Sequence, residues 1–180
     1  KKHVCQKIID GGFGAFCLTE PGAGSDASAG TTTAVKDGDE WVLNGRKCFI
    51  TNGPLADYTA VYALTEPEKK AKGLSCFVVK KGTPGFSVGK IEDKMGIRSA
   101  QVSEMILENV RVPKENMIVE SGQGFKLAMK TLDGGRIGVA AQGLGIAEGA
   151  FEIAKEYLKT REQFGKPLYR NQYLAFKMAE

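Results

Sequence analysis

Histidine and tryptophan are the scarcest residues of this 180-residue chain, which has one of each, His3 and Trp41. A metal site rich in imidazole ligands needs several histidines, and a Ser-His-Asp triad needs one beside its nucleophile. The lone histidine near the start of the chain argues against both. We therefore expect no metal site and no triad chemistry in these residues.

Cysteines are few and scattered. Cys5, Cys17, Cys48 and Cys76 form no C-x-x-C pair and lie in or near apolar runs. Reduced thiols in the core of a cytosolic protein fit this pattern better than disulfides or a zinc site.

Long apolar runs and an excess of one charge are also missing. No run approaches the ~20 residues of a membrane-spanning helix, so no membrane span is expected. The formal charge of +4 is spread along the chain without a basic stripe, so we expect no nucleic-acid partner. With 42% hydrophobic residues, the chain is long enough to bury one good core or two small ones.

Both ends of the sequence look cut. The chain begins Lys-Lys-His-Val without an initiator methionine or a signal-peptide pattern, and it stops within an expected helix. We expect a piece of a larger protein, with a short helical lead-in before the first strand.

Strand-forming runs separated by turn residues fill the chain up to Pro113. Asp37-Gly38 is a strong hairpin signal, and Asn44-Gly45 predicts a second turn. No strand-helix-strand alternation is present, so the pattern predicts an antiparallel β barrel or sandwich. The predicted strands cover residues 31–35, 41–43, 47–51, 58–65, 74–79, 86–91 and 102–112.

Helical periodicity replaces the strand pattern after Pro113. From Arg136, apolar residues recur at steps of three and four, which predicts a long amphipathic helix whose glycines allow close packing against other helices. A break at 164–167 precedes a further helix that starts near Leu168. We place a β domain with its helical lead-in at 1–117 and an incomplete helical domain at 118–180. The apolar stripe consists of Ile137, Ala140, Leu144, Ala147, Phe151, Ala154 and Leu158.

The stretch TEPGAGSD at 19–26 contains a formal match to the glycine fingerprint of dinucleotide-binding folds. The fingerprint must open a helix, but the residues that follow read as turn and strand, so this interpretation is rejected. Small residues in a turn, with the hydroxyl of Ser25, can still form an anion-binding concavity. The alternative, which the local pattern favours, is a plain turn after an edge strand.

Phe49 and Thr51 come at the end of a predicted strand in the same β-rich region. This strand can meet the segment from Phe16 to Thr19 across a sheet, where the ring would cover a planar heterocycle and the hydroxyl would bond to it. Core packing with a turn hydroxyl is the alternative.

Two further stretches contain charged residues next to glycines. Asp133-Gly-Gly-Arg136 predicts a junction where one helix ends and the long one begins, with Asp133 as a cap, or a contact to amides and phosphates of an extended ligand. Arg161 and Phe164 end the long helix. They either complement its dipole or recognise a phosphate and a ring at a subunit contact.

The order of these motifs is more specific than any one of them. TEPGAGSD, NGRKCFITNG at 44–53, MGIR at 95–98, ENVRVP at 108–113, LDGGR at 132–136 and REQFG at 161–165 with Gln172 closely resemble the acyl-CoA dehydrogenase family, most of all its short-chain, butyryl-CoA-type branch. The resemblance implies a middle β domain followed by the first helices of a C-terminal helical domain. It also implies a tetramer, with FAD between the two domains.

The resemblance assigns the flavin contacts to two β segments and to the neighbouring subunit. The threonine of the Phe49-x-Thr51 element would bond near flavin N5, with Phe49 where many members have tryptophan. The residues implied for FAD are Phe16, Leu18, Thr19, Ser25, Phe49 and Thr51, and those implied for the FAD of a neighbouring subunit are Arg161, Phe164 and Gln172.

The resemblance also assigns residues to the acyl-CoA substrate, which are Ser25, Thr65, Asp133 and Arg136. The implied reaction is α,β-dehydrogenation of an acyl-CoA thioester, an oxidation of a CH–CH group whose electrons pass to an electron-transferring flavoprotein. The catalytic glutamate is implied to lie beyond Glu180. The alternative family position for it is Gly135, so the isolated piece is expected to be inactive.

Glu20, Asp26, Glu104 and Glu148 match neither family position for the base. The implied compartment is a bacterial cytoplasm or the mitochondrial matrix. Two alternatives stay open beside the dehydrogenase, namely a related acyl-CoA oxidase or CoA-ester reductase, and a non-catalytic β module with an oligomerisation helix.

Overall fold

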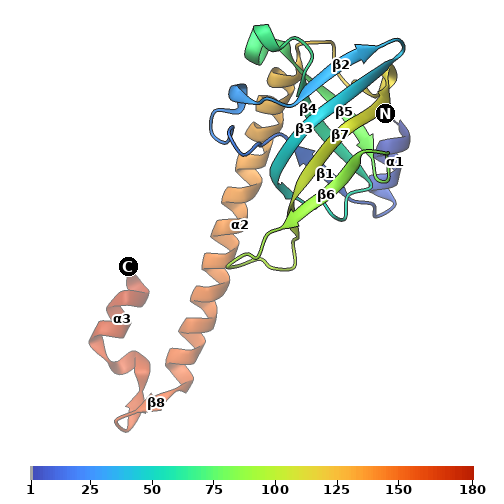
Figure 1. The fold of residues 1–180 in the computed structure, drawn as a ribbon. Coiled ribbons are helices and arrows are strands. Elements are labelled where there is room, and N and C mark those ends of the chain that lie inside the picture. Colours follow the sequence, from blue (N-terminus) through green and yellow to red (C-terminus); the bar gives the residue numbers. More distant parts are fainter. Residues whose placement is uncertain (1) are drawn as a thin grey trace. The chain divides into compact units, whose positions relative to one another are not determined.

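The computed structural model describes residues 2–180, in which a short helix precedes the strands of a large sheet and two helices follow them (Figure 1). Two compact units divide the chain, one ending at Lys130 and the other covering Thr131–Glu180. The helices are α1 (Lys2–Ile9), α2 (Gly124–Thr160) and α3 (Gln172–Ala179). The strands are β1 (Gly14–Cys17), β2 (Thr33–Asp37), β3 (Glu40–Thr51), β4 (Tyr58–Leu64), β5 (Leu74–Lys80), β6 (Phe86–Ile91), β7 (Val102–Pro113), β8 (Glu162–Gln163) and β9 (Lys166–Pro167).

Within residues 2–180, seven strands form one curled half-barrel sheet, and β8 and β9 form a separate hairpin. The order in the large sheet is β1-β4-β2-β3-β7-β6, with β5 paired to β4. Most pairs are antiparallel, which confirms the predicted class of a β barrel or sandwich followed by long helices. The pairing of β4 with β1 and, at Leu64, with β2 is parallel, which the sequence pattern did not indicate.

The predicted turn at Asn44-Gly45 is wrong. Both residues lie inside β3, where the register with β7 shifts between Leu43 and Gly45. The Asn44 side chain accepts a hydrogen bond from the amide of Asn109 at 2.8 Å, and a Cβ on Gly45 would lie 2.4 Å from the Thr32 hydroxyl. The Asn-Gly signal therefore marks a β-bulge, because β7 continues beside the strand and holds it extended.

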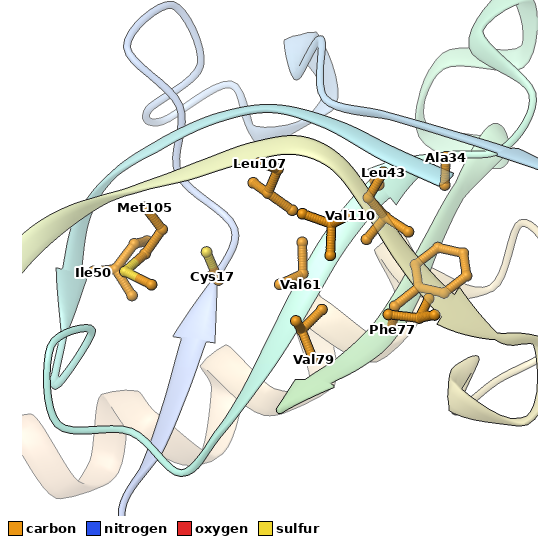
Figure 2. Close-up of a cluster of buried hydrophobic side chains, with 12 residues drawn as sticks. Cys17, Ala34, Leu43, Ile50, Val61, Phe77, Val79, Met105, Leu107 and Val110 are labelled. Carbon is orange, nitrogen blue, oxygen red and sulfur yellow. The ribbon is translucent and has the colours of Figure 1, made fainter. Parts of the chain in front are cut away.

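Side chains from six strands meet in the core of the half-barrel (Figure 2). Cys17 on β1 and Ile50 on β3 both belong to this cluster, and each is almost completely buried. The residues next to them in sequence, Leu18–Thr19 after Cys17 and Phe49 and Thr51 on either side of Ile50, are therefore anchored to the same core. Its close packing restricts their movement.

Burial raises the pKa of the Cys17 and Cys76 thiols to about 12 each, which keeps both neutral. Both are free thiols in the core, as expected. Cys5 differs from the prediction, because it is exposed on α1.

The predicted helix junction at Asp133-Gly-Gly-Arg136 is also wrong. Helix α2 runs without interruption from Gly124 to Thr160, so the two glycines are interior residues and Asp133 is not a cap. Each glycine costs about 1 kcal/mol relative to alanine, but the cooperative helix extends on both sides of the pair and includes them. The last helix begins at Gln172, after a 3-10 turn at Leu168–Arg170, rather than near Leu168.

Helix α2 exposes much of its apolar surface. Ile137, Leu144 and Ile153 are more than two thirds exposed. Among residues 2–180, no helix combines the length and apolarity that crossing a membrane requires.

Candidate functional site

The two β segments singled out by sequence lie side by side in the first unit. The amide of Cys48 donates to the carbonyl oxygen of Thr19 at 3.0 Å. One residue earlier, Nζ of Lys47 donates to the carbonyl oxygen of Leu18 at 2.9 Å. The predicted approach of the Phe49–Thr51 strand to the Phe16–Thr19 segment is therefore observed.

A buried ion pair joins the same segments. Nζ of Lys47 lies 2.8 Å from Oε1 of Glu20, and the two side chains are only 1% and 5% exposed. The carboxylate also accepts hydrogen bonds from the Thr31 amide at 2.6 Å, the Thr31 hydroxyl at 2.9 Å and the Thr32 amide at 3.0 Å. Glu20 thereby fixes both ends of the loop from residue 20 to residue 32 against β3.

Sequence reasoning missed this pair, since Glu20 was only noted as an acid without a role. A signal existed, because Lys47 begins the predicted strand 47–51 and is followed directly by the apolar residues Cys48-Phe49-Ile50. A lysine on a buried strand face requires an acidic partner, because an unpaired buried charge is strongly destabilising.

The ion pair keeps Glu20 ionised. Burial alone would raise the pKa of this carboxyl, but the Lys47 charge and the hydrogen bonds from Lys47, Thr32 and Thr31 outweigh it and lower the pKa from 4.5 to about 2. The ionised form of Glu20 is therefore more stable in the folded state than in the unfolded chain.

Acid should release the stabilisation that Glu20 provides. Below pH 4.5 the unfolded chain binds a proton at this position before the folded state does, so stability falls as the pH drops from 4.5 toward 2. The complete loss is on the order of 3 kcal/mol. We expect urea midpoints measured between pH 6 and pH 3 to fall more steeply for the wild-type protein than for Glu20→Gln. Parallel slopes would contradict the assignment.

The loop that follows Glu20 offers unpaired donors. Paired backbone hydrogen bonds of 3.1 and 3.0 Å join Glu20 and Ala23 in a tight turn. In the described part of the chain, the amides of Gly22, Gly24 and Ser25 and the Ser25 hydroxyl have no acceptor. Several free donors on one short loop suit a polar or anionic ligand, as the concavity interpretation of this loop requires.

Phe49 is held in an unusual backbone conformation. Its φ is +56°, and the register of β3 with β7 shifts between Lys47 and Ile50. The bulge turns the ring outward, so that 64% of Phe49 is exposed while Ile50 is buried. A left-handed phenylalanine costs about 1–2 kcal/mol, and an exposed ring does not repay this through packing. This strain points to a ligand contact rather than the core-packing alternative.

Thr51 and Phe16, the other candidate residues near Phe49, differ in whether their side chains are free to contact a ligand. The Thr51 hydroxyl is exposed and has no hydrogen-bond partner in residues 2–180. Phe16 is half-buried and packs its ring against Tyr62, with centroids 5.1 Å apart. Phe16 therefore supports the site through packing, whereas Phe49 and Thr51 present free groups.

Thr65 lies at the centre of a hydroxyl cluster. Its Oγ1 lies 2.9 Å from Oγ of Ser75 and 3.0 Å from Oγ of Ser121, and it donates to the carbonyl oxygen of Gly73 at 3.1 Å. The cluster ties the end of β4 to the start of β5 and to the loop before α2. A ligand that bonds to Thr65 would have to replace one of these partners.

The remaining candidate residues belong to the second unit. Arg136 donates to the Asp133 carboxylate at 2.8 Å, one helical turn away, and both side chains are exposed. Phe164 and Gly165 form the two-residue turn between β8 and β9 with φ of +55° and +71°, and Phe164 is 95% exposed. Arg161 directly precedes β8 and Gln172 is the first residue of α3, and both are exposed.

A cavity of about 870 Å³ lies elsewhere in the first unit. It is bounded by α1, β1, β4, β5 and residues 115–127, and of the predicted site residues it includes only Phe16. Its lining is mainly apolar, as in a packing surface, so we assign no ligand to it.

Comparison with known proteins covers both units. Residues 15–110 match the acyl-CoA dehydrogenase middle domain, and residues 122–180 match the acyl-CoA dehydrogenase C-terminal domain. The short-chain specific acyl-CoA dehydrogenase of Megasphaera elsdenii is 56% identical over 182 residues, covering 100% of this chain and 48% of the relative.

Two further matches follow the same pattern. The acryloyl-CoA reductase (NADH) of Anaerotignum propionicum is 52% identical over 100% of this chain and 46% of its own. The structure of butyryl-CoA dehydrogenase from Megasphaera elsdenii superimposes with a TM-score of 0.93 at 54% identity, covering 96% of this chain and 46% of that one. The chain thus spans less than half the length of these relatives.

Proposed function

Since the chain belongs to the acyl-CoA dehydrogenase family, we propose that it is part of a short-chain acyl-CoA dehydrogenase that uses FAD. Residues 1–117 would form the middle β domain with its lead-in, and 118–180 the start of the C-terminal helical domain. The observation that carries the proposal is the exposed, strained Phe49 ring beside the Leu18–Thr19 segment in a chain 56% identical to a short-chain enzyme.

The residues of the first unit fit a flavin. An exposed aromatic face, a free Thr51 hydroxyl and the free donors of the loop with Ser25 are the groups that a planar ring with a phosphate tail requires. Phe49 and Thr51 would hold the ring, the backbone at Leu18 and Thr19 would meet its pyrimidine side, and Ser25 would serve both cofactor and substrate. Phe16 would support them through its contact with Tyr62.

The proposed reaction removes two hydrogens from the α and β carbons of an acyl-CoA thioester. FAD, when bound, supplies the hydride acceptor. Thr65, Asp133 and Arg136 would bind and orient the CoA ester. A glutamate outside this chain would take the α proton, so we expect these 180 residues alone to be inactive.

The assembly also extends beyond this chain. Arg161, Phe164 and Gln172 would reach FAD in a neighbouring subunit of a homotetramer, which gives the strained, 95% exposed Phe164 a partner. Electrons would pass to an electron-transferring flavoprotein. The compartment would be a bacterial cytoplasm, or the mitochondrial matrix in a eukaryote.

A reductase is the second candidate function, favoured by the 52% identity to an acryloyl-CoA reductase. The same site would then add hydrogen to an unsaturated CoA ester. A related oxidase would differ in how the reduced flavin reacts with oxygen. A non-catalytic module would bind neither flavin nor CoA ester.

The decisive experiment uses the complete protein. We expect it to purify with a yellow flavin spectrum that bleaches when butyryl-CoA is added without oxygen. Bleaching by NADH, but not by butyryl-CoA, would favour the reductase, and rapid recovery of colour in air would favour an oxidase. A colourless protein that takes up no added FAD would contradict the proposal.

A further inference from the structure

We propose that the buried Lys47 ammonium polarises the Leu18–Thr19 peptide group, so that the Thr19 amide becomes a strong hydrogen-bond donor that raises the midpoint potential of the bound flavin. The inference rests on the proposed function, and it adds a role for two residues outside the predicted set of flavin contacts. Lys47 and Glu20 act as positioning residues, through the peptide group rather than by direct contact.

The geometry places a full positive charge on one peptide oxygen. Nζ of Lys47 lies 2.9 Å from the carbonyl oxygen of Leu18, and the side chain is 1% exposed, so water does not screen the contact. The carbonyl of Leu18 and the amide of Thr19 share one conjugated group. A cation at the oxygen draws electron density from the amide nitrogen and strengthens the N–H as a donor, as in any polarised chain of hydrogen bonds.

The Thr19 amide is also available and fixed. Within residues 2–180 it donates to no acceptor. The next peptide group is anchored, because the Thr19 carbonyl oxygen accepts from the Cys48 amide at 3.0 Å. A donor held between two anchored carbonyl groups needs little rearrangement to bind a ligand.

Glu20 determines how much of the positive charge of Lys47 acts on the flavin. Its carboxylate lies 2.8 Å from Nζ of Lys47 and cancels part of the field of the ammonium at longer range. Reduction adds negative charge to a flavin, and nearby positive charge or strong donors favour that form. Removing the acid should therefore raise the midpoint potential, and removing the base should lower it.

Opposite signs distinguish this role from a structural one. If the pair only shaped the loop from residue 20 to residue 32, damage to either partner would loosen the same loop. Both substitutions would then shift the midpoint potential in the same direction, or not at all, while weakening FAD binding.

The test measures the midpoint potential of the complete FAD-loaded protein at pH 7, by anaerobic reduction against a dye of known potential. The variants are Glu20→Gln, Lys47→Met, Lys47→Arg and the double variant Glu20→Gln/Lys47→Met. We expect Glu20→Gln to lie above the wild type, Lys47→Met below it, and Lys47→Arg close to it. A tenfold change in the reduction equilibrium corresponds to about 30 mV for a two-electron couple.

The double variant keeps the test independent of folding defects. It removes both charges together, so it should fold even if Lys47→Met does not, and its midpoint potential should lie well below that of Glu20→Gln. Equal potentials in Glu20→Gln, Lys47→Arg and the double variant would overturn the inference while leaving the proposed function intact. A wild-type protein that binds no FAD would contradict the proposed function itself.

Discussion

We expect the Lys47→Met variant to lose about 3–5 kcal/mol of unfolding free energy, because methionine leaves Glu20 as an unpaired buried charge. The carboxylate is 5% exposed and would keep its donors at Thr31 and Thr32, but these hydrogen bonds do not neutralise it. The pKa of Glu20 should rise once its cationic partner is gone. Urea unfolding of the apo form of the complete protein measures this loss. It appears as a lower urea midpoint, with no change in the slope of unfolding free energy against urea concentration.

Two controls separate charge from volume. Lys36→Met makes the same substitution at an exposed position on β2, and it should change stability by less than about 0.5 kcal/mol. The double variant Glu20→Gln/Lys47→Met should recover much of the loss, because neither charge is then buried alone. Equal losses in the single and double variants would mean that Lys47 contributes by packing and not by charge.

The sheet was predictable from the sequence to the extent that its signals are local. The strands at 58–65 and 86–91 follow from β propensity and turn residues within a few positions. The hairpin predicted from Asp37-Gly38 forms one residue later, because Asp37 pairs with Glu40 and the turn consists of Gly38 and Asp39. Asn44-Gly45 carries the same local signal as a hairpin but forms a bulge. The partner strand that decides between the two outcomes lies 65 residues away at Asn109.

The approach of the two candidate segments was predictable from the sequence, but the buried ion pair that joins them was not. Motif order pointed to Ser25 and Thr51, and the structure brings the segments that contain them together through the bonds of Leu18 and Thr19. The Lys47–Glu20 pair was not found, because the pairing of two charged residues across 27 positions depends on the register of the sheet. The prediction of a helix junction at Asp133 was wrong for the opposite reason, because the cooperativity of a long helix overrode local capping signals.

The second large effect is expected at Phe49. Replacing it by glycine should leave the unfolding free energy of the apo form within about 1 kcal/mol of wild type, because relief of the left-handed strain offsets the lost contacts of a ring that is 64% exposed. The same variant should lose about tenfold to hundredfold in FAD affinity, because stacking on an aromatic ring contributes about 1–3 kcal/mol. Fluorescence titration of the apo protein with FAD measures the affinity, and urea unfolding measures the stability.

Two further variants assign the loss of affinity to the ring itself. Asparagine tolerates the left-handed conformation but has no ring, so Phe49→Asn should match Phe49→Gly in FAD affinity. Phe49→Trp keeps a planar face and should bind FAD within a few-fold of wild type. If Phe49→Gly instead lost more than about 2 kcal/mol of stability and bound FAD normally, the ring would be a packing residue. The strained bulge would then serve the fold, and the flavin would have to be held by other groups.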